Sequence, residues 1–106
     1  MPVPGWATPE GTAAYARRFQ GRAADGHFRL CQGLTLSSIG LGTYLGEPDE
    51  ATDAAYSGSV ERAAALGCNV MDSAINYRFQ RSERSIGAAM RKLARESAAK
   101  MPKAAA

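Results

Sequence analysis

A short stretch, residues 67–77, most constrains the fold of this chain, because it separates two alanine-rich runs that have helical spacing. Gly67 is a favourable residue just beyond the end of a helix. If the following residues form a strand, Val70, Asp72 and Ala74 share one of its faces. A carboxylate at the end of a mostly apolar strand is unusual for a core, and functional residues gather at that end in α/β barrels. The stretch predicts a helix–strand–helix unit with a candidate site at Asp72.

The flanking segments extend this unit in both directions. The alternation of residues 38–43 predicts a strand, and residues 28–36 predict a hairpin that turns near Gln32 and Gly33. A helix is expected over residues 50–66, ahead of a strand at 69–74. A final helix should begin near residue 82. The predicted order is therefore hairpin, strand, helix, strand and helix.

The two ends of the chain have weaker patterns. Thr8 and Pro9 are a good helix start, with threonine as the N-cap, and predict a helix to about Phe19. This helix belongs to an N-terminal extension of residues 1–27. The sequence leaves two alternatives for the extension: a helix docked on the domain, or a poorly tethered segment. Residues 98–106 have no strand pattern and are expected to be an unstructured tail.

Three motifs in the middle of the chain follow one another at a characteristic spacing. They are Gly-Leu-Gly-Thr-Tyr at residues 40–44, Asp-Ser-Ala-Ile-Asn-Tyr at residues 72–77 and Ser-Glu-Arg-Ser-Ile-Gly at residues 82–87. In this order they resemble the aldo/keto reductases over about residues 34–93. The resemblance implies an α/β fold, a partial (β/α)8 TIM barrel made of the N-terminal hairpin and the first two βα units. It assigns residues 28–97 to this truncated barrel.

The same resemblance implies a chemistry. Aldo/keto reductases transfer a hydride from NADP(H) to a carbonyl compound, and a tyrosine protonates the carbonyl oxygen. By position, Tyr77 is the expected catalytic acid and Asp72 its catalytic partner, while Thr43, Tyr44 and Asp72 are the expected cofactor-binding residues. The family takes its catalytic lysine and histidine from the third and fourth strands, which this sequence does not contain. The isolated chain is therefore expected to be inactive.

Each of these residues also has a structural interpretation. Gly40 and Gly42 could admit a ligand or simply allow tight strand packing. Asp72 could cap a turn, and Tyr77 could be a half-buried aromatic residue. Ser82 is a candidate N-cap of the last helix. Arg81 and Arg84 are most simply a solvated face, and the alternative is a contact with a cofactor phosphate.

Composition narrows the function classes. The chain has 106 residues, enough for one small domain, and a formal charge of +3 with scattered basic residues, which does not favour nucleic-acid binding. Cys31, Cys68 and the single histidine, His27, lack metal-site spacing. Two unpaired thiols and no membrane-length apolar run predict a cytoplasmic protein that binds no metal and no membrane. The alternative to a reductase is a non-enzymatic interaction fragment that self-associates through open strand edges.

Overall fold

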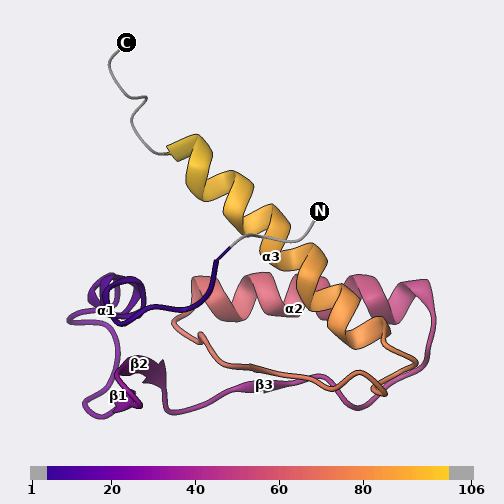
Figure 1. Cartoon of the computed structure of the whole chain (residues 1–106), viewed down its shortest axis with the longest axis horizontal. Coiled ribbons are helices and arrows are strands. Elements are labelled where there is room, and N and C mark those ends of the chain that lie inside the picture. The colour runs from indigo at the N-terminus through magenta and orange to yellow at the C-terminus, as the bar shows by residue number, and fades with distance from the viewer. Residues whose placement is uncertain (1–4, 101–106) are drawn as a thin grey trace.

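A computed structural model describes residues 5–100 of the chain, with side chains to residue 97. The described residues form a small α/β structure with three helices and two two-stranded sheets, and they form no closed barrel (Figure 1). The elements are, in chain order, α1 (Pro9–Arg17), β1 (Phe28–Cys31), β2 (Leu34–Ser37), β3 (Leu41–Gly42), α2 (Glu50–Ala65), β4 (Met71–Asp72) and α3 (Arg81–Lys100). This is the predicted order of elements.

The second sheet is the part of the fold that positions the predicted site. Strands β3 and β4 are parallel, and α2 connects them. The register pairs Leu41 with Met71, both half-buried, and Gly42 with Asp72, both exposed. Because side chains alternate along a strand, one side of this sheet is covered and the other is open. The predicted strand–helix–strand unit is confirmed.

Both strands are shorter than the sequence predicts. Residues 38–43 and 69–74 were expected to be strands, but only two residues of each pair in the ladder. Each strand has a single neighbour among the described residues, so few backbone groups find a partner across the sheet. A side chain supplies some of the missing bonds, since the Ser37 hydroxyl accepts a hydrogen bond from the Asn69 amide at 3.1 Å and donates to the Ile39 carbonyl at 2.7 Å.

Helix α1 is docked on the rest of the domain. Thr8 caps it by accepting a hydrogen bond from the Gly11 amide at 2.9 Å, as predicted. It ends at Arg17, two residues before the predicted end. The Thr12 hydroxyl accepts a bond from the Thr35 amide of β2 at 2.9 Å, and Phe19 is only 5% exposed. Of the two alternatives for the N-terminal extension, the structure has the docked helix.

The hairpin and the end of α2 show the expected turn residues. Strands β1 and β2 are antiparallel and turn at Gln32 and Gly33, whose φ angles are 52° and 82°. Positive φ at both positions is typical of a type I′ turn. Gly67 follows α2 with φ 103°, so its predicted role at the helix end is confirmed. His27 lies with Nε2 2.9 Å from the Gly67 carbonyl oxygen, which joins the hairpin to this turn.

Helix α3 differs from its prediction at both ends. It begins at Arg81, and Ser82 is not its N-cap, because the Ser82 hydroxyl donates to the carbonyl of Thr43 instead. It continues to Lys100, so the expected tail is wrong for residues 98–100, and residues 101–106 lie outside the described part. Ala98, Ala99 and Lys100 are residues of high helix propensity, so a helix that is already nucleated extends through them at little cost.

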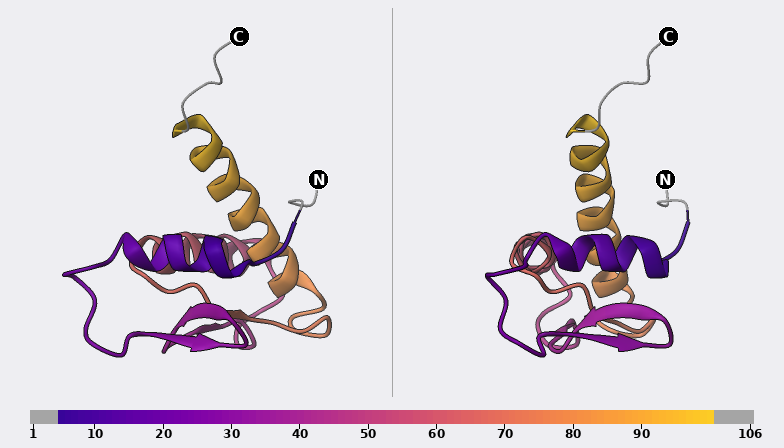
Figure 2. Two further views of the ribbon diagram at one scale, coloured as in Figure 1. Left: turned by 60° about the vertical axis from the view of Figure 1, so that its left-hand side comes forward. Right: turned by 90° about the vertical axis from the view of Figure 1, so that its left-hand side faces the viewer.

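The core lies between the helices and the covered side of the strands. In Figure 2, α1 and α2 lie on one side of the strands, and α3 extends away from them. The most buried residues are small, among them Val60 of α2 and Ala89 of α3. Of the helices described, none is long and apolar enough to cross a membrane.

Candidate functional site

The predicted site residues meet at the carboxyl edge of the parallel strands. The hydroxyl of Thr43, just past β3, donates to the main-chain carbonyl of Asp72 at 2.7 Å. Thr43 is fully buried, and its own carbonyl accepts a bond from Ser82 of α3. Strands β3 and β4 and helix α3 therefore meet at Thr43, which lies beside Asp72 at the carboxyl end of the strands.

The two tyrosines of the predicted site are also in contact. The rings of Tyr44 and Tyr77 have centroids 5.0 Å apart and meet edge to face at 74°. Tyr44 is exposed and Tyr77 is half-buried. Thr43, Tyr44, Asp72 and Tyr77 thus belong to one edge, although among the described residues no hydrogen bond joins the Tyr77 hydroxyl to the Asp72 carboxylate.

The glycines of the first motif have different environments. A Cβ atom built on Gly40 would lie 3.1 Å from Val70 Cγ1 and 3.2 Å from the Val70 carbonyl oxygen. One built on Gly42 would meet nothing within 4 Å. Gly40 therefore allows close strand packing, whereas Gly42, paired with the exposed Asp72, leaves open space at the site. The packing interpretation therefore applies to Gly40, and the ligand interpretation of Gly42 stays a prediction.

An arginine network that the sequence analysis missed lies beside this edge. The Arg78 guanidinium is 2.6 Å from Asp53 of α2, and its side chain is only 1% exposed. Arg81, expected to be solvated, also pairs with Asp53, at 2.5 Å. Desolvation raises the pKa of Asp53, but hydrogen bonds and positive charge from the two arginines outweigh it and hold this pKa below its usual value. An acidic residue in the first turn of a helix is common because of the helix dipole, so Asp53 did not indicate an arginine partner in the sequence.

The lysine chemistry of the resembled family has no counterpart among the described side chains. Lys92 pairs with Glu61 across α3 and α2 at 2.9 Å. A hydrogen bond and the negative charge of Glu61 raise the pKa of Lys92, which keeps its amine protonated. The described residues also contain no group of three or more His, Cys, Asp or Glu residues that could hold a metal ion.

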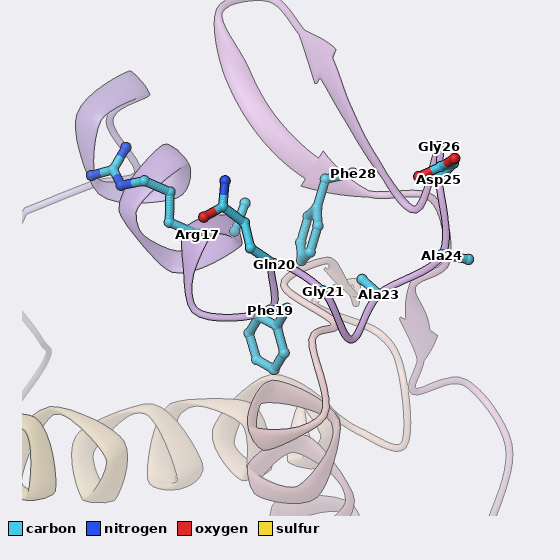
Figure 3. A pocket seen from close by; sticks show the side chains of 10 residues that line it. Arg17, Phe19, Gln20, Gly21, Ala23, Ala24, Asp25, Gly26 and Phe28 are labelled. Atoms are coloured by element: carbon cyan, nitrogen blue, oxygen red, sulfur yellow. The ribbon is translucent and has the colours of Figure 1, made fainter.

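A shallow pocket of about 350 Å³ lies at the other end of the domain (Figure 3). The end of α1, the following loop and Phe28 line it, and Phe19, which also lines it, has its ring close to Gly67 after α2. Because α2 runs back from the carboxyl edge of β3 to the start of β4, this pocket is remote from Asp72 and Thr43. It does not belong to the candidate site.

Comparisons of the chain with protein-family models, with curated proteins and with solved structures found no match in any of the three. A functional assignment must therefore come from the chain's own residues. The features available for it are the parallel strand pair, the open side at Gly42 and Asp72, and the contact between Tyr44 and Tyr77.

Proposed function

We propose that this chain forms the N-terminal part of a carbonyl reductase of the aldo/keto reductase type, dependent on NADP(H). The observation that carries the proposal is the meeting of Thr43, Asp72, Tyr44 and Tyr77 at one carboxyl edge. Nothing in local sequence spacing requires Thr43 and Asp72, 29 positions apart, to be neighbours. Their contact arises only because β3 and β4 are parallel and in this register.

The fold supports the finer proposal of a partial (β/α)8 barrel. The order β3–α2–β4–α3, with parallel strands, is two copies of the strand–helix unit from which such barrels are built. In barrels the helices cover the outer side of the strands, and the inner side carries the site at its carboxyl end. The exposed side that holds Gly42 and Asp72 corresponds to the inner side.

The chemistry asked of these residues is proton delivery. In carbonyl reduction a hydride adds to the carbonyl carbon, and a proton adds to its oxygen; the nicotinamide cofactor supplies the hydride when it is bound. The Tyr77 hydroxyl donates the proton and is left as a phenolate, which regains a proton from solvent. A free phenol has a pKa of about 10, so an ammonium group must stabilise the phenolate for fast transfer. In the resembled family that ammonium is a lysine of the third strand, with Asp72 at the position of its carboxylate partner.

Gly42, Thr43 and Tyr44 would contribute to holding the cofactor. The empty space beside Gly42 lets a planar ring approach the strand backbone, which no residue with a Cβ would allow as closely. The hydrogen bonds of Thr43 hold this strand end in place. Isolated from the third and fourth strands, these residues make an incomplete site.

A second candidate function is an interaction fragment, which the exposed apolar side chains favour. Leu30 in β1 and Ile39 just before β3 are 78% and 62% exposed. Both lie on or beside strands with one paired edge among the described residues, and open edges are templates for pairing with another chain. Light scattering over a hundredfold dilution series tests this function. A strictly monomeric chain at all concentrations would exclude self-association.

A hybrid enzyme tests the reductase proposal. Residues 34–97 would replace the first two βα units of an active aldo/keto reductase, which then supplies the missing strands. We expect a folded hybrid that oxidises NADPH in the presence of small aldehydes, with turnover reduced in Asp72→Asn. A hybrid that melts cooperatively but shows no turnover would refute the proposal.

A further inference from the structure

We propose that Arg78 is a positioning residue that holds Tyr44 and Tyr77 together at the carboxyl edge. Its relevance to catalysis rests on the proposed function, but the geometry can be tested without it. Arg78 directly follows Tyr77, and its side chain is almost completely buried. A buried guanidinium must be paired and hydrogen-bonded, so its partners show which parts of the chain it fixes.

Those partners lie on the loop that carries Tyr44. Arg78 Nε donates to the Glu47 carbonyl at 3.0 Å, and Nη2 donates to the Asp49 carbonyl at 3.4 Å. The Arg78 guanidinium lies over the ring of Tyr56, with the guanidinium carbon 5.0 Å from the ring centroid. The planar fork of arginine can make these contacts at once, and lysine cannot.

Hydrogen bonds of the same network hold the loop on both sides of Tyr44. Arg78 Nη1 donates to the Ser82 hydroxyl at 3.4 Å, and Ser82 donates to the carbonyl of Thr43. The Tyr56 hydroxyl donates to the carbonyl of Leu45. The residues before and after Tyr44 are therefore both bonded to side chains that contact Arg78.

The backbone at Arg78 follows an unusual path that this network maintains. Arg78, Phe79 and Gln80 have φ angles of 50°, 54° and 68°, which are unfavourable for residues other than glycine. Strained backbone of this kind persists only where its surroundings fix it. Arg84 adds bonds to the carbonyls of Phe79, at 3.1 Å, and Gln80, at 3.4 Å. The strained turn sets the direction of the chain directly after Tyr77.

Asp53 supplies the charge that allows Arg78 to be buried. Its Oδ1 accepts a hydrogen bond from Arg78 Nη2 at 2.6 Å, and its Oδ2 accepts one from Arg81 Nη1 at 2.5 Å. Asp53 lies in the first turn of α2, so the network is anchored on a helix rather than on a loop. A purely stabilising ion pair would need only this contact; the bonds to the Tyr44 loop are additional.

Nuclear Overhauser effects between aromatic rings of the full chain test the inference. The wild-type chain should show an effect between Tyr44 and Tyr77, at 5.0 Å, and one between Tyr15 and Phe19, at 5.1 Å. In Arg78→Lys, we expect at least a threefold loss of the first effect and no change in the second. Lys92→Gln, which removes an exposed ion pair instead, should leave both unchanged.

The outcomes separate positioning from simple stabilisation. If Arg78→Lys lowers the melting temperature but keeps both effects at wild-type strength, the inference is wrong. If Arg78→Lys does not fold, Ser82→Ala provides the second test, because it removes the link from Arg78 to the Thr43 carbonyl. Loss of the Tyr44–Tyr77 effect in that variant supports the inference, and its full retention refutes it. None of these results depends on reductase activity, so an inactive hybrid would refute the proposed function alone.

Discussion

Replacement of Gly40 by alanine tests how closely β3 and β4 must pack to bring Thr43 to Asp72. The new Cβ would lie 3.1 Å from Val70 Cγ1, 3.3 Å from Val70 Cβ and 3.2 Å from the Val70 carbonyl oxygen. All three distances are shorter than an ordinary van der Waals contact of about 3.5–4.0 Å. Val70 cannot simply withdraw, because its carbonyl accepts the Leu41 amide at 2.9 Å.

The magnitude follows from two opposing effects. Overpacking of this kind costs about 1–3 kcal/mol. Loss of glycine's freedom in the unfolded chain returns about 0.4–1 kcal/mol. We expect Gly40→Ala to lower the free energy of unfolding by about 1–2 kcal/mol, which corresponds to a decrease in melting temperature of roughly 4–16 °C for a domain of this size.

Gly42→Ala, in β3 and two residues further along the chain, is the matched control. Its Cβ would meet nothing within 4 Å, and neither glycine has a positive φ angle. The free energy of unfolding of this variant should be about 0.5 kcal/mol higher than that of the wild-type chain, because alanine lowers the conformational entropy of the unfolded state. Both variants would be unfolded by urea under circular dichroism. If Gly40→Ala were as stable as Gly42→Ala, the inferred tight approach of β3 to β4 would be wrong.

Four further predictions concern stability, pH, activity and association. Phe19→Ala should destabilise the chain by about 3–5 kcal/mol, because it removes a buried ring between α1 and Gly67. Trp6→Ala, at an 87% exposed position, should change the free energy of unfolding by less than about 0.5 kcal/mol. Because the pKa of Asp53 is lowered in the folded state, its contribution to stability is complete well above pH 3.8 and is lost as the pH falls through the lowered folded value. Urea titrations of Asp53→Asn should therefore show a weaker decline of the free energy of unfolding over this acid range than those of the wild-type chain. The purified chain alone should not oxidise NADPH with small aldehydes, and turnover that disappears in Tyr77→Phe would contradict this. The chain should be marginally stable and associate as its concentration rises; a concentration-independent, monomeric transition at high denaturant would show that the docked α1 covers enough apolar surface.

Local patterns predicted the order of elements well, because each depends on neighbouring residues. The Thr8 cap, the Gln32–Gly33 turn and the role of Gly67 follow from backbone preferences that the sequence displays directly. Element ends were less predictable, since they depend on tertiary partners. Serine is a favoured N-cap residue, yet the Ser82 hydroxyl donates its hydrogen bond to the buried carbonyl of Thr43 instead.

The membership of the candidate site stays a prediction, and only part of the site's geometry follows from the sequence. Parallel strands have their carboxyl ends at one edge of a sheet, and at this edge Thr43 and Asp72 meet. The Arg78 network could not be predicted, because it joins residues 25 to 31 positions apart through a left-handed turn of non-glycine residues. No local preference encodes such a turn. Only the bonds formed in the folded chain make it favourable.

The central claim is that Tyr77 occupies the position of a proton donor for carbonyl reduction. The most direct measurement is the ratio of kcat/KM between the hybrid enzyme that carries residues 34–97 and its Tyr77→Phe variant. Since a positioned acid contributes about 10²–10⁴-fold to rate, we expect the variant to fall by at least about a hundredfold while its melting temperature changes little. An active hybrid in which Tyr77→Phe leaves kcat/KM within about twofold would contradict the claim.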